Sequence, residues 1–250
     1  MAERRAKRRR RRSNGALYIT VIIALMLIAV IFGLSVFFKV SAIEVAGVSM
    51  YTDEEVIAAS GIEQGDSIFF VDQSAAAIKI KDALPYADEV RISRKLPDTV
   101  MISVAESYPI ASVSSGGYRW IIDKNAKILE KTDTSGAEGT IEIRGAEPVM
   151  ATVGDSLALG EEGSVKLTYL RAVLSAILAE GMQNEITWLD VSNISDICFD
   201  YMGRFTVSLG KGDYLEDKLW MLEQVTADRG ETEKGSIDLS QENEGHFIPD

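Results

Sequence analysis

The most pronounced pattern in the chain is an uninterrupted apolar run near its N-terminus. No charged residue occurs from Ala16 to Phe38, a stretch of 23 positions rich in Ile, Leu, Val and Phe. As a helix this stretch would be about 34 Å long, slightly more than the roughly 30 Å hydrocarbon core of a bilayer. The pattern therefore predicts a transmembrane helix over residues 16–38.

The region that follows the apolar run changes period several times. Between residues 39 and 111 the pattern reads strand, helix, helix, strand, strand. Thr52 and Glu55 have the spacing of a capping box, and Gly61 is suited to end that helix in the left-handed conformation. The order predicts a small α+β unit with its helices on one face of a sheet.

Most of the remaining chain has the alternating pattern of strands. Two helical patterns interrupt it, one opening at Ser164 and one after Asp213, and a short strand is predicted at the end. The fold class is therefore α+β, with a mostly antiparallel β domain that carries two helices. The predicted organisation is a basic tail (1–15), a transmembrane helix (16–38), an α+β unit (39–111), a β domain (112–240) and a flexible polar tail (241–250).

Charge divides the chain into two unlike parts. Residues 1–12 hold eight of the 26 basic residues and one of the 38 acidic ones, which leaves a net charge of −19 on the rest. Basic residues before an apolar helix favour a cytoplasmic N-terminus, so the body is expected outside the cytoplasm. The residues assigned to set this topology are Arg8, Arg9, Arg10, Arg11 and Arg12.

Two other interpretations of the N-terminal region are less favoured. Val40-Ser41-Ala42 resembles a signal-peptide cleavage site, but the apolar run is longer than the 7–15 residues typical of a signal peptide. The basic block could contact nucleic acid, yet no aromatic residue interleaves it. Contact with anionic lipid headgroups explains the block more simply, and no nucleic-acid partner is predicted.

Candidate chemistry is sparse. Cys198 and His246 are the only cysteine and histidine, which excludes an internal disulfide and the usual zinc sites. Cys198 is expected to be a buried, inert residue of a strand. The acidic cluster Asp53 to Glu55 is explained by its place at a helix N-terminus. No catalytic residue, cofactor or metal is predicted, and the protein is not expected to be an enzyme.

Several strings of residues, in order, resemble the FtsQ/DivIB family of bitopic bacterial cell division proteins. They cover roughly residues 16–240, behind a matching apolar anchor. Two departures are Ser107, where the family has Arg, and Ala126, where Gly is common. The matching strings are Ile43–Gly47, Arg94–Val104, Glu106–Ala111, Ile122–Leu129, Leu209-Gly210 with Lys218-Leu219, and Gly235–Leu239.

The resemblance implies a fold and a function. Residues 39–111 would be a POTRA domain, and the protein would be a non-enzymatic scaffold of the division septum in the cell membrane. Its β domain would bind FtsL and an FtsB/DivIC-type protein and link early ring components to septal peptidoglycan synthases. Two alternatives are a carboxylate-dependent wall hydrolase of the cell envelope and a POTRA-type chaperone, although repeated POTRA units are not found.

The candidate partner site is the terminal strand. Residues Ser236, Ile237, Asp238, Leu239 and Ser240 alternate in polarity and precede a polar tail. A short strand near a chain end can leave an exposed sheet edge, whose unpaired backbone groups can accept a partner strand. The other interpretation is that this strand only closes the sheet and that partners bind elsewhere.

Overall fold

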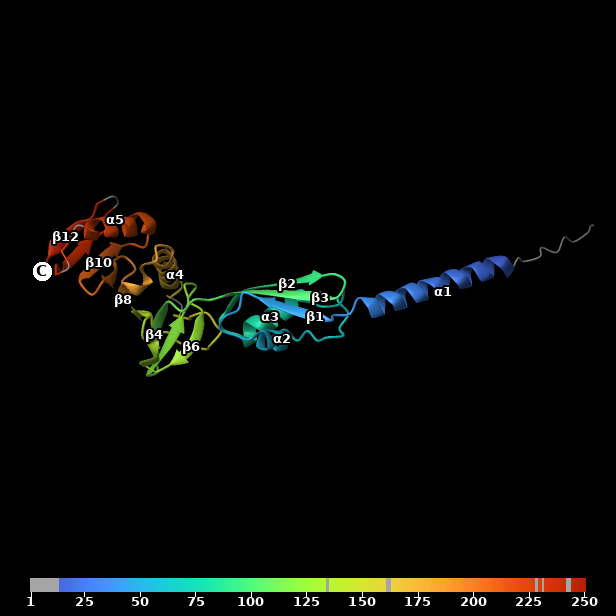
Figure 1. The fold of residues 1–250 in the computed structure, drawn as a ribbon. Coiled ribbons are helices and arrows are strands. Elements are labelled where there is room, and N and C mark those ends of the chain that lie inside the picture. Colours follow the sequence, from blue (N-terminus) through green and yellow to red (C-terminus); the bar gives the residue numbers. More distant parts are fainter. Residues whose placement is uncertain (1–13, 134, 161–162, 228, 231, 242–243) are drawn as a thin grey trace, which may run out of the picture.

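The computed structural model describes residues 14–250 except 134, 161–162, 228, 231 and 242–243. Figure 1 shows a long N-terminal helix, a small sheet with two helices, and a larger sheet that follow one another along the molecule. The C-terminus lies at the end opposite the N-terminal helix. The α+β class expected from the sequence is confirmed.

The apolar N-terminal run forms α1 (Asn14–Phe37), a helix of 24 residues. The side chains described from Tyr18 to Gly33 are all exposed. Within the part of the chain that the structure describes, no helix combines the length and the apolar character needed to cross a membrane. The transmembrane span therefore stays a prediction from the sequence. Arg8 to Arg12 lie outside the described residues.

The POTRA-like unit (residues 39–111) has the predicted strand and helix order. Glu55 N donates to Thr52 Oγ1 and Thr52 N donates to Glu55 Oε2, so the predicted capping box is present. Gly61 closes the helix with φ +66°. Among the described residues the sheet has three strands in the order β1-β3-β2. The elements are β1 (Ala42–Ala46), α2 (Asp53–Ser60), α3 (Gln73–Ala83), β2 (Ala87–Lys95) and β3 (Thr99–Glu106).

A separate hydrophobic core holds this unit together. Val56 of α2, Ile80 of α3 and Ile102 of β3 are each fully buried and belong to one cluster. β1 pairs parallel with β3, and β2 pairs antiparallel with it, so β3 is the central strand. Both helices cover one face of this sheet, as the sequence pattern predicts (Figure 1).

Gly47 gives a test of how closely this unit is packed. Its φ is +85°, and an added Cβ would overlap the Val104 carbonyl oxygen. Gly47→Ala should destabilise the unit by about 2–4 kcal/mol, because positive φ and backbone overlap both oppose it. Gly65→Ala is the matched control, since Gly65 has φ +97° but no heavy atom within 4 Å of an added Cβ. Urea unfolding should show the larger loss for Gly47→Ala; equal losses would contradict the overlap.

The β domain (β4 to β12) is one large mixed sheet. Among the described residues it has nine strands in the order β12-β11-β10-β9-β8-β7-β4-β5-β6. Five of the eight pairs are antiparallel and three are parallel. The strands are β4 (Ala111–Ser115), β5 (Tyr118–Ile122), β6 (Ile128–Thr132), β7 (Ile141–Arg144), β8 (Ile186–Asp190), β9 (Ile197–Tyr201), β10 (Phe205–Gly210), β11 (Gly235–Asp238) and β12 (His246–Pro249).

Two helices pack on the sheet, as predicted. They are α4 (Gly163–Ala179) and α5 (Leu215–Ala227). Leu170, Leu174 and Leu222 of these helices are fully buried against strand residues such as Phe199 and Phe205. The Asp213 carboxylate, expected to cap α5, accepts a hydrogen bond of 2.9 Å from Lys218 Nζ. Sequence reasoning missed β4 and β7, which are only five and four residues long.

The junction between the two units is held by polar contacts around Asp123. Its Oδ1 accepts from the backbone amides of Asn125 and Lys127, at 2.9 and 2.8 Å, as expected for Asp in a turn. Ser107, the residue that departs from the family pattern, donates to Asp123 Oδ2 at 2.9 Å in a buried position. Lys127 Nζ reaches back to the Ala87 carbonyl at 2.9 Å, which ties the β domain to the POTRA-like unit.

Candidate partner-binding edge

The C-terminal residues form the outer end of the large sheet. β11 pairs parallel with β10 on one side and antiparallel with β12 on the other. The prediction of a flexible tail over 241–250 is therefore wrong for residues 246–249, which form β12. Residues 246–249 are ordered because their backbone groups pair with β11 and the Phe247 ring packs against Phe205.

The predicted partner strand, Ser236 to Ser240, does not lie at the edge. Ile237 and Leu239 are fully buried in the core of the β domain, beneath α5. Ser236 and Asp238 are half-buried on the other face of the sheet, and Ser240 N donates to Asp238 Oδ1. The assumption that this strand has an unpaired side is wrong, because β12 covers it. The sheet edge itself lies one strand further out.

The register shows which backbone groups of β12 face outward. Asp250 N donates to the Lys234 carbonyl at 3.3 Å, so these residues are an exchanging pair. In antiparallel strands exchanging pairs recur at every second residue, which places Ile248 and His246 in exchange with β11. The amide and carbonyl of Phe247 then face away from β11. Among the described strands, β12 pairs with β11 alone.

Side chains on β12 alternate between the core and the open face. The Phe247 ring packs edge-on against Phe205 with centroids 6.0 Å apart, and the Arg229 guanidinium lies 4.1 Å from its centroid. These contacts hold β12 on the sheet. Ile248 points the other way and is 59% exposed. The edge thus combines a free backbone position with an exposed apolar side chain.

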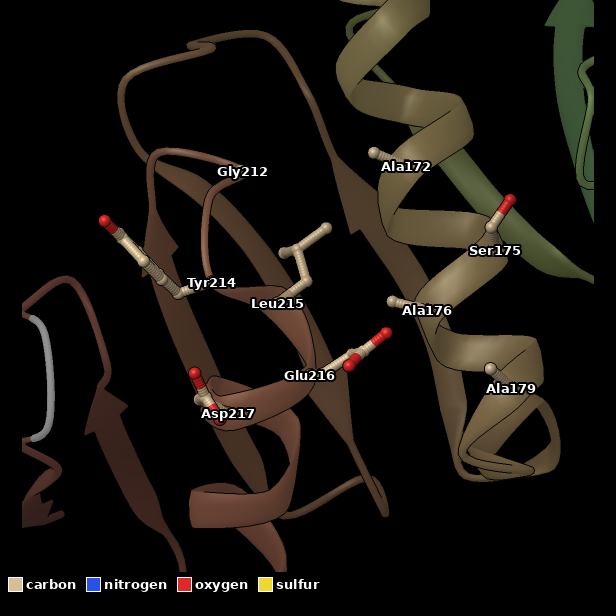
Figure 2. Close-up of a pocket in the computed structure, with 9 residues that line it drawn as sticks. All are labelled: Ala172, Ser175, Ala176, Ala179, Gly212, Tyr214, Leu215, Glu216 and Asp217. Carbon is tan, nitrogen blue, oxygen red and sulfur yellow. The ribbon is translucent and has the colours of Figure 1, made fainter.

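A hollow of about 500 Å³ lies between α4 and the start of α5, and its lining includes no residue of β12. Figure 2 shows Leu215 and Glu216 directed toward α4, with Tyr214 directed away from it. The α4 wall is made of small side chains, among them Ala172 and Ala176, so the helices leave space between them. The walls supply one carboxylate that points inward, together with apolar surface.

The carboxylates at this hollow do not converge. Glu216 points toward α4 in Figure 2, whereas its neighbour Asp217 points to another side of α5. Consecutive helical residues are separated by about 100°, which explains the divergence. Glycoside hydrolysis needs two carboxyl groups on opposite sides of one bond. The geometry therefore does not favour the wall-hydrolase interpretation at this position.

The lone cysteine and histidine are not arranged as a nucleophile and its general base. Cys198 is only partly buried, on the open face of the sheet, and not fully buried as expected. Burial, with the nearby Asp196 carboxylate, raises the pKa of the Cys198 thiol to about 11, so it is mostly protonated near neutral pH. His246 is exposed on β12, and its Nε2 lies 3.4 Å from Glu244 Oε2.

Sequence reasoning missed the residues that form the edge, Phe247 and Ile248. One signal was present: His246-Phe247-Ile248-Pro249 combines β-favouring residues with a proline that is tolerated at sheet edges. The segment is only four residues long, and acidic and glycine residues precede it. A short apolar pair in such surroundings gives weak evidence of a strand.

Comparison with known proteins shows which family the chain resembles. Residues 38–107 match the model of the FtsQ-type POTRA domain. The chain is 29% identical over 214 residues to the cell division protein DivIB of Clostridium botulinum strain Hall, covering 84% of this chain and 82% of that protein. It is 30% identical over 145 residues to the cell division protein FtsQ of Corynebacterium glutamicum, covering 58% of each.

The two kinds of match agree with the fold. The matched POTRA residues coincide with the unit built from β1 to β3, α2 and α3, and the DivIB match, which covers 84% of the chain, reaches into the β domain. The relatives are named as cell division proteins, which gives the chain a role in that process. The chain carries an FtsQ-type POTRA domain and is similar, over most of its length, to the FtsQ/DivIB family of bacterial cell division proteins.

Proposed function

We propose that the protein is a non-enzymatic scaffold of the division septum. It binds FtsL and an FtsB/DivIC-type protein through its β domain and couples ring assembly to septal peptidoglycan synthases. Similarity to proteins named as cell division proteins supports the cell division role. The feature that carries the binding proposal is the free side of β12, where the Phe247 backbone faces outward beside the exposed Ile248.

The mode of binding follows from this edge. A partner segment in extended conformation would pair with the outward amide and carbonyl of Phe247, and its side chains would contact Ile248. Pro249 has no amide, so the donor pattern ends there and limits the length that can pair. Short pairing of this kind needs added side-chain contacts, which the exposed Ile248 can supply.

The proposal includes a membrane anchor formed by residues 16–38. The support is the uncharged apolar run of 23 residues and the basic block Arg8 to Arg12 before it. This arrangement favours a cytoplasmic N-terminus and an extracytoplasmic body. Anchoring would hold the β domain, at the far end of the molecule in Figure 1, away from the membrane surface.

The second candidate, a wall hydrolase, has weaker support. A hydrolase needs convergent carboxylates in a pocket, and Glu216 and Asp217 diverge at the hollow between α4 and α5. Incubation of the purified full-length protein with peptidoglycan should leave the fragment pattern unchanged. Release of soluble fragments by the wild type would reinstate this candidate.

An Ile248→Asp variant tests the edge. Aspartate on the free edge should disfavour strand addition and contact with an apolar partner, so capture of co-expressed FtsL and FtsB/DivIC-type protein should fall at least about tenfold, or roughly 1.4 kcal/mol. The thermal melt should change little, because Ile248 is 59% exposed. Capture is measured by quantitative pull-down of the full chain from membranes.

The matched control is Val165→Asp on α4, where the residue is 51% exposed. An acid in the first turn of a helix is favourable, so this variant should remain folded and capture both partners normally. Normal capture by Ile248→Asp would refute the edge. Equal loss in both variants would show that added negative charge, and not the β12 edge, weakens binding.

A further inference from the structure

Large apolar side chains are exposed at the end of the POTRA-like unit that adjoins α1. Phe70 is 89% exposed, Leu96 59% and Phe69 50%. Isolated exposed apolar residues are common on protein surfaces and need no explanation. These residues differ because they lie together at the end of the POTRA-like unit that is next to the C-terminal end of α1. The last residue of α1, Phe37, is also exposed.

Backbone hydrogen bonds bring the segments that carry them together. The linker after α1 pairs with the loop 65–71, since Ile68 N donates to the Phe38 carbonyl at 3.0 Å and Val40 N donates to the Asp66 carbonyl at 2.8 Å. The turn between β2 and β3 joins them, because Ser41 N donates to the Asp98 carbonyl at 2.8 Å. We call this region the α1-proximal tip (residues 37–41, 65–71 and 95–98).

Aromatic contacts continue from α1 into the tip. The rings of Phe37 and Phe38 are 5.7 Å apart, and those of Phe38 and Phe69 are 5.0 Å apart. Phe70 follows in sequence with its side chain in solvent. The loop is well fixed beneath it, because Ile68 is fully buried in the core and Arg94 Nη2 donates to the Val71 carbonyl at 2.7 Å. Because the residues on either side of Phe69 and Phe70 are held in place, the backbone of this loop keeps the Phe70 side chain in solvent.

We propose that the α1-proximal tip inserts Phe69, Phe70 and Leu96 into the headgroup region of the outer leaflet. This inference rests on the proposed membrane anchor, because Phe38 ends the apolar run and so places the tip at the membrane surface. Exposed Phe and Leu side chains are stabilised at the boundary between headgroups and acyl chains, where they leave water. Insertion gives the POTRA-like unit a fixed orientation relative to the bilayer.

The charges of the tip indicate which lipid property matters. Within the tip, Lys39 and Lys95 are balanced by Asp66 and Asp98, and the chain after residue 12 has a net charge of −19. Attraction to anionic headgroups is therefore small. The interaction depends on apolar contact, so it should persist in zwitterionic phosphatidylcholine vesicles and change little with salt.

Site-specific fluorescence in vesicles tests the inference. Full-length Cys198→Ser protein carrying Phe70→Cys is labelled with an environment-sensitive fluorophore and reconstituted into phosphatidylcholine vesicles. The label should be quenched by spin-labelled lipid and be several-fold less quenched by aqueous iodide than a label at Ile78→Cys. Ile78 lies on α3, is 60% exposed and is outside the tip, so it is the matched control.

The outcomes separate this inference from the anchor proposal. Before labelling is interpreted, the reconstituted protein is floated on a density gradient after an alkaline wash. Failure to float would overturn the proposed anchor and the inference with it. Flotation with equal iodide quenching at positions 70 and 78 would overturn the inference alone. A Phe70→Ser variant that melts normally should also become accessible to protease at loop 65–71 in vesicles; unchanged protection would contradict insertion.

Discussion

Removal of residues 235–250 is expected to unfold the β domain and leave the POTRA-like unit folded. The deletion takes away β11 and β12, and with them the buried side chains of Ile237 and Leu239. Losing two buried aliphatic side chains costs about 4–10 kcal/mol, which matches or exceeds the stability of a typical domain. Loss of partner capture by this variant would therefore report unfolding and would say nothing specific about the edge.

Calorimetry distinguishes the two units. The POTRA-like unit has its own core, around Val56, Ile80 and Ile102, so its thermal transition should survive the deletion. A chain that ends at Ser240 is the control, because it keeps β11 and its buried residues and loses only β12. That control should show both transitions, with the β domain destabilised by loss of the Phe247 contacts. A cooperative β-domain transition in the longer deletion would refute the assignment of β11 to the core.

Replacement of Lys218 by Met is expected to destabilise the β domain by about 2–4 kcal/mol. The Lys218 ammonium is almost wholly buried and donates to the Leu209 carbonyl at 2.8 Å, the Lys211 carbonyl at 3.2 Å and Asp213 Oδ1 at 2.9 Å. These bonds fasten the start of α5 to the end of β10. Met keeps the length of the side chain but leaves two carbonyls without this donor.

The control is Lys211→Met, which removes the same charge from an exposed side chain and should change the stability by less than about 0.5 kcal/mol. Urea unfolding of the full-length protein measures both. The bond from Lys218 lowers the pKa of Asp213. The stability from this pair is therefore present above the unfolded carboxyl pKa and is lost as pH falls through the lower folded value. Equal stability of both variants would contradict a structural role for Lys218.

The POTRA-like unit could be predicted from the sequence because the patterns that indicate it are local. A capping box, a left-handed glycine and alternating apolar residues each depend on residues a few positions apart, and Thr52 and Gly61 have the predicted roles. The resemblance to the family could be recognised for a related reason, since the matching strings are also local and occur in the expected order.

The partner edge could not be predicted from the sequence, because the tertiary structure determines which strands are neighbours. The alternation of Ile237 and Leu239 correctly indicated a strand but could not show that both side chains pack beneath α5. β12 joins β11 across a segment that includes two residues outside the described set, and its pairing depends on backbone bonds that any sequence can make. Lys218 is a further example, since its charge predicts exposure and only the carbonyls of Leu209 and Lys211 make its burial favourable.

The sequence alone determined the apolar run of residues 16–38, the asymmetry of charge around it, the α+β class and the lack of catalytic histidine and cysteine pairs. These properties depend on composition and short-range periodicity, which can be read directly from the order of residues along the chain. Only the tertiary structure decided that β11 is internal, that β12 is the free edge and that Phe70 is exposed beside α1. Those properties arise from which distant segments pair, and pairing is decided by the burial and hydrogen bonding of the whole chain.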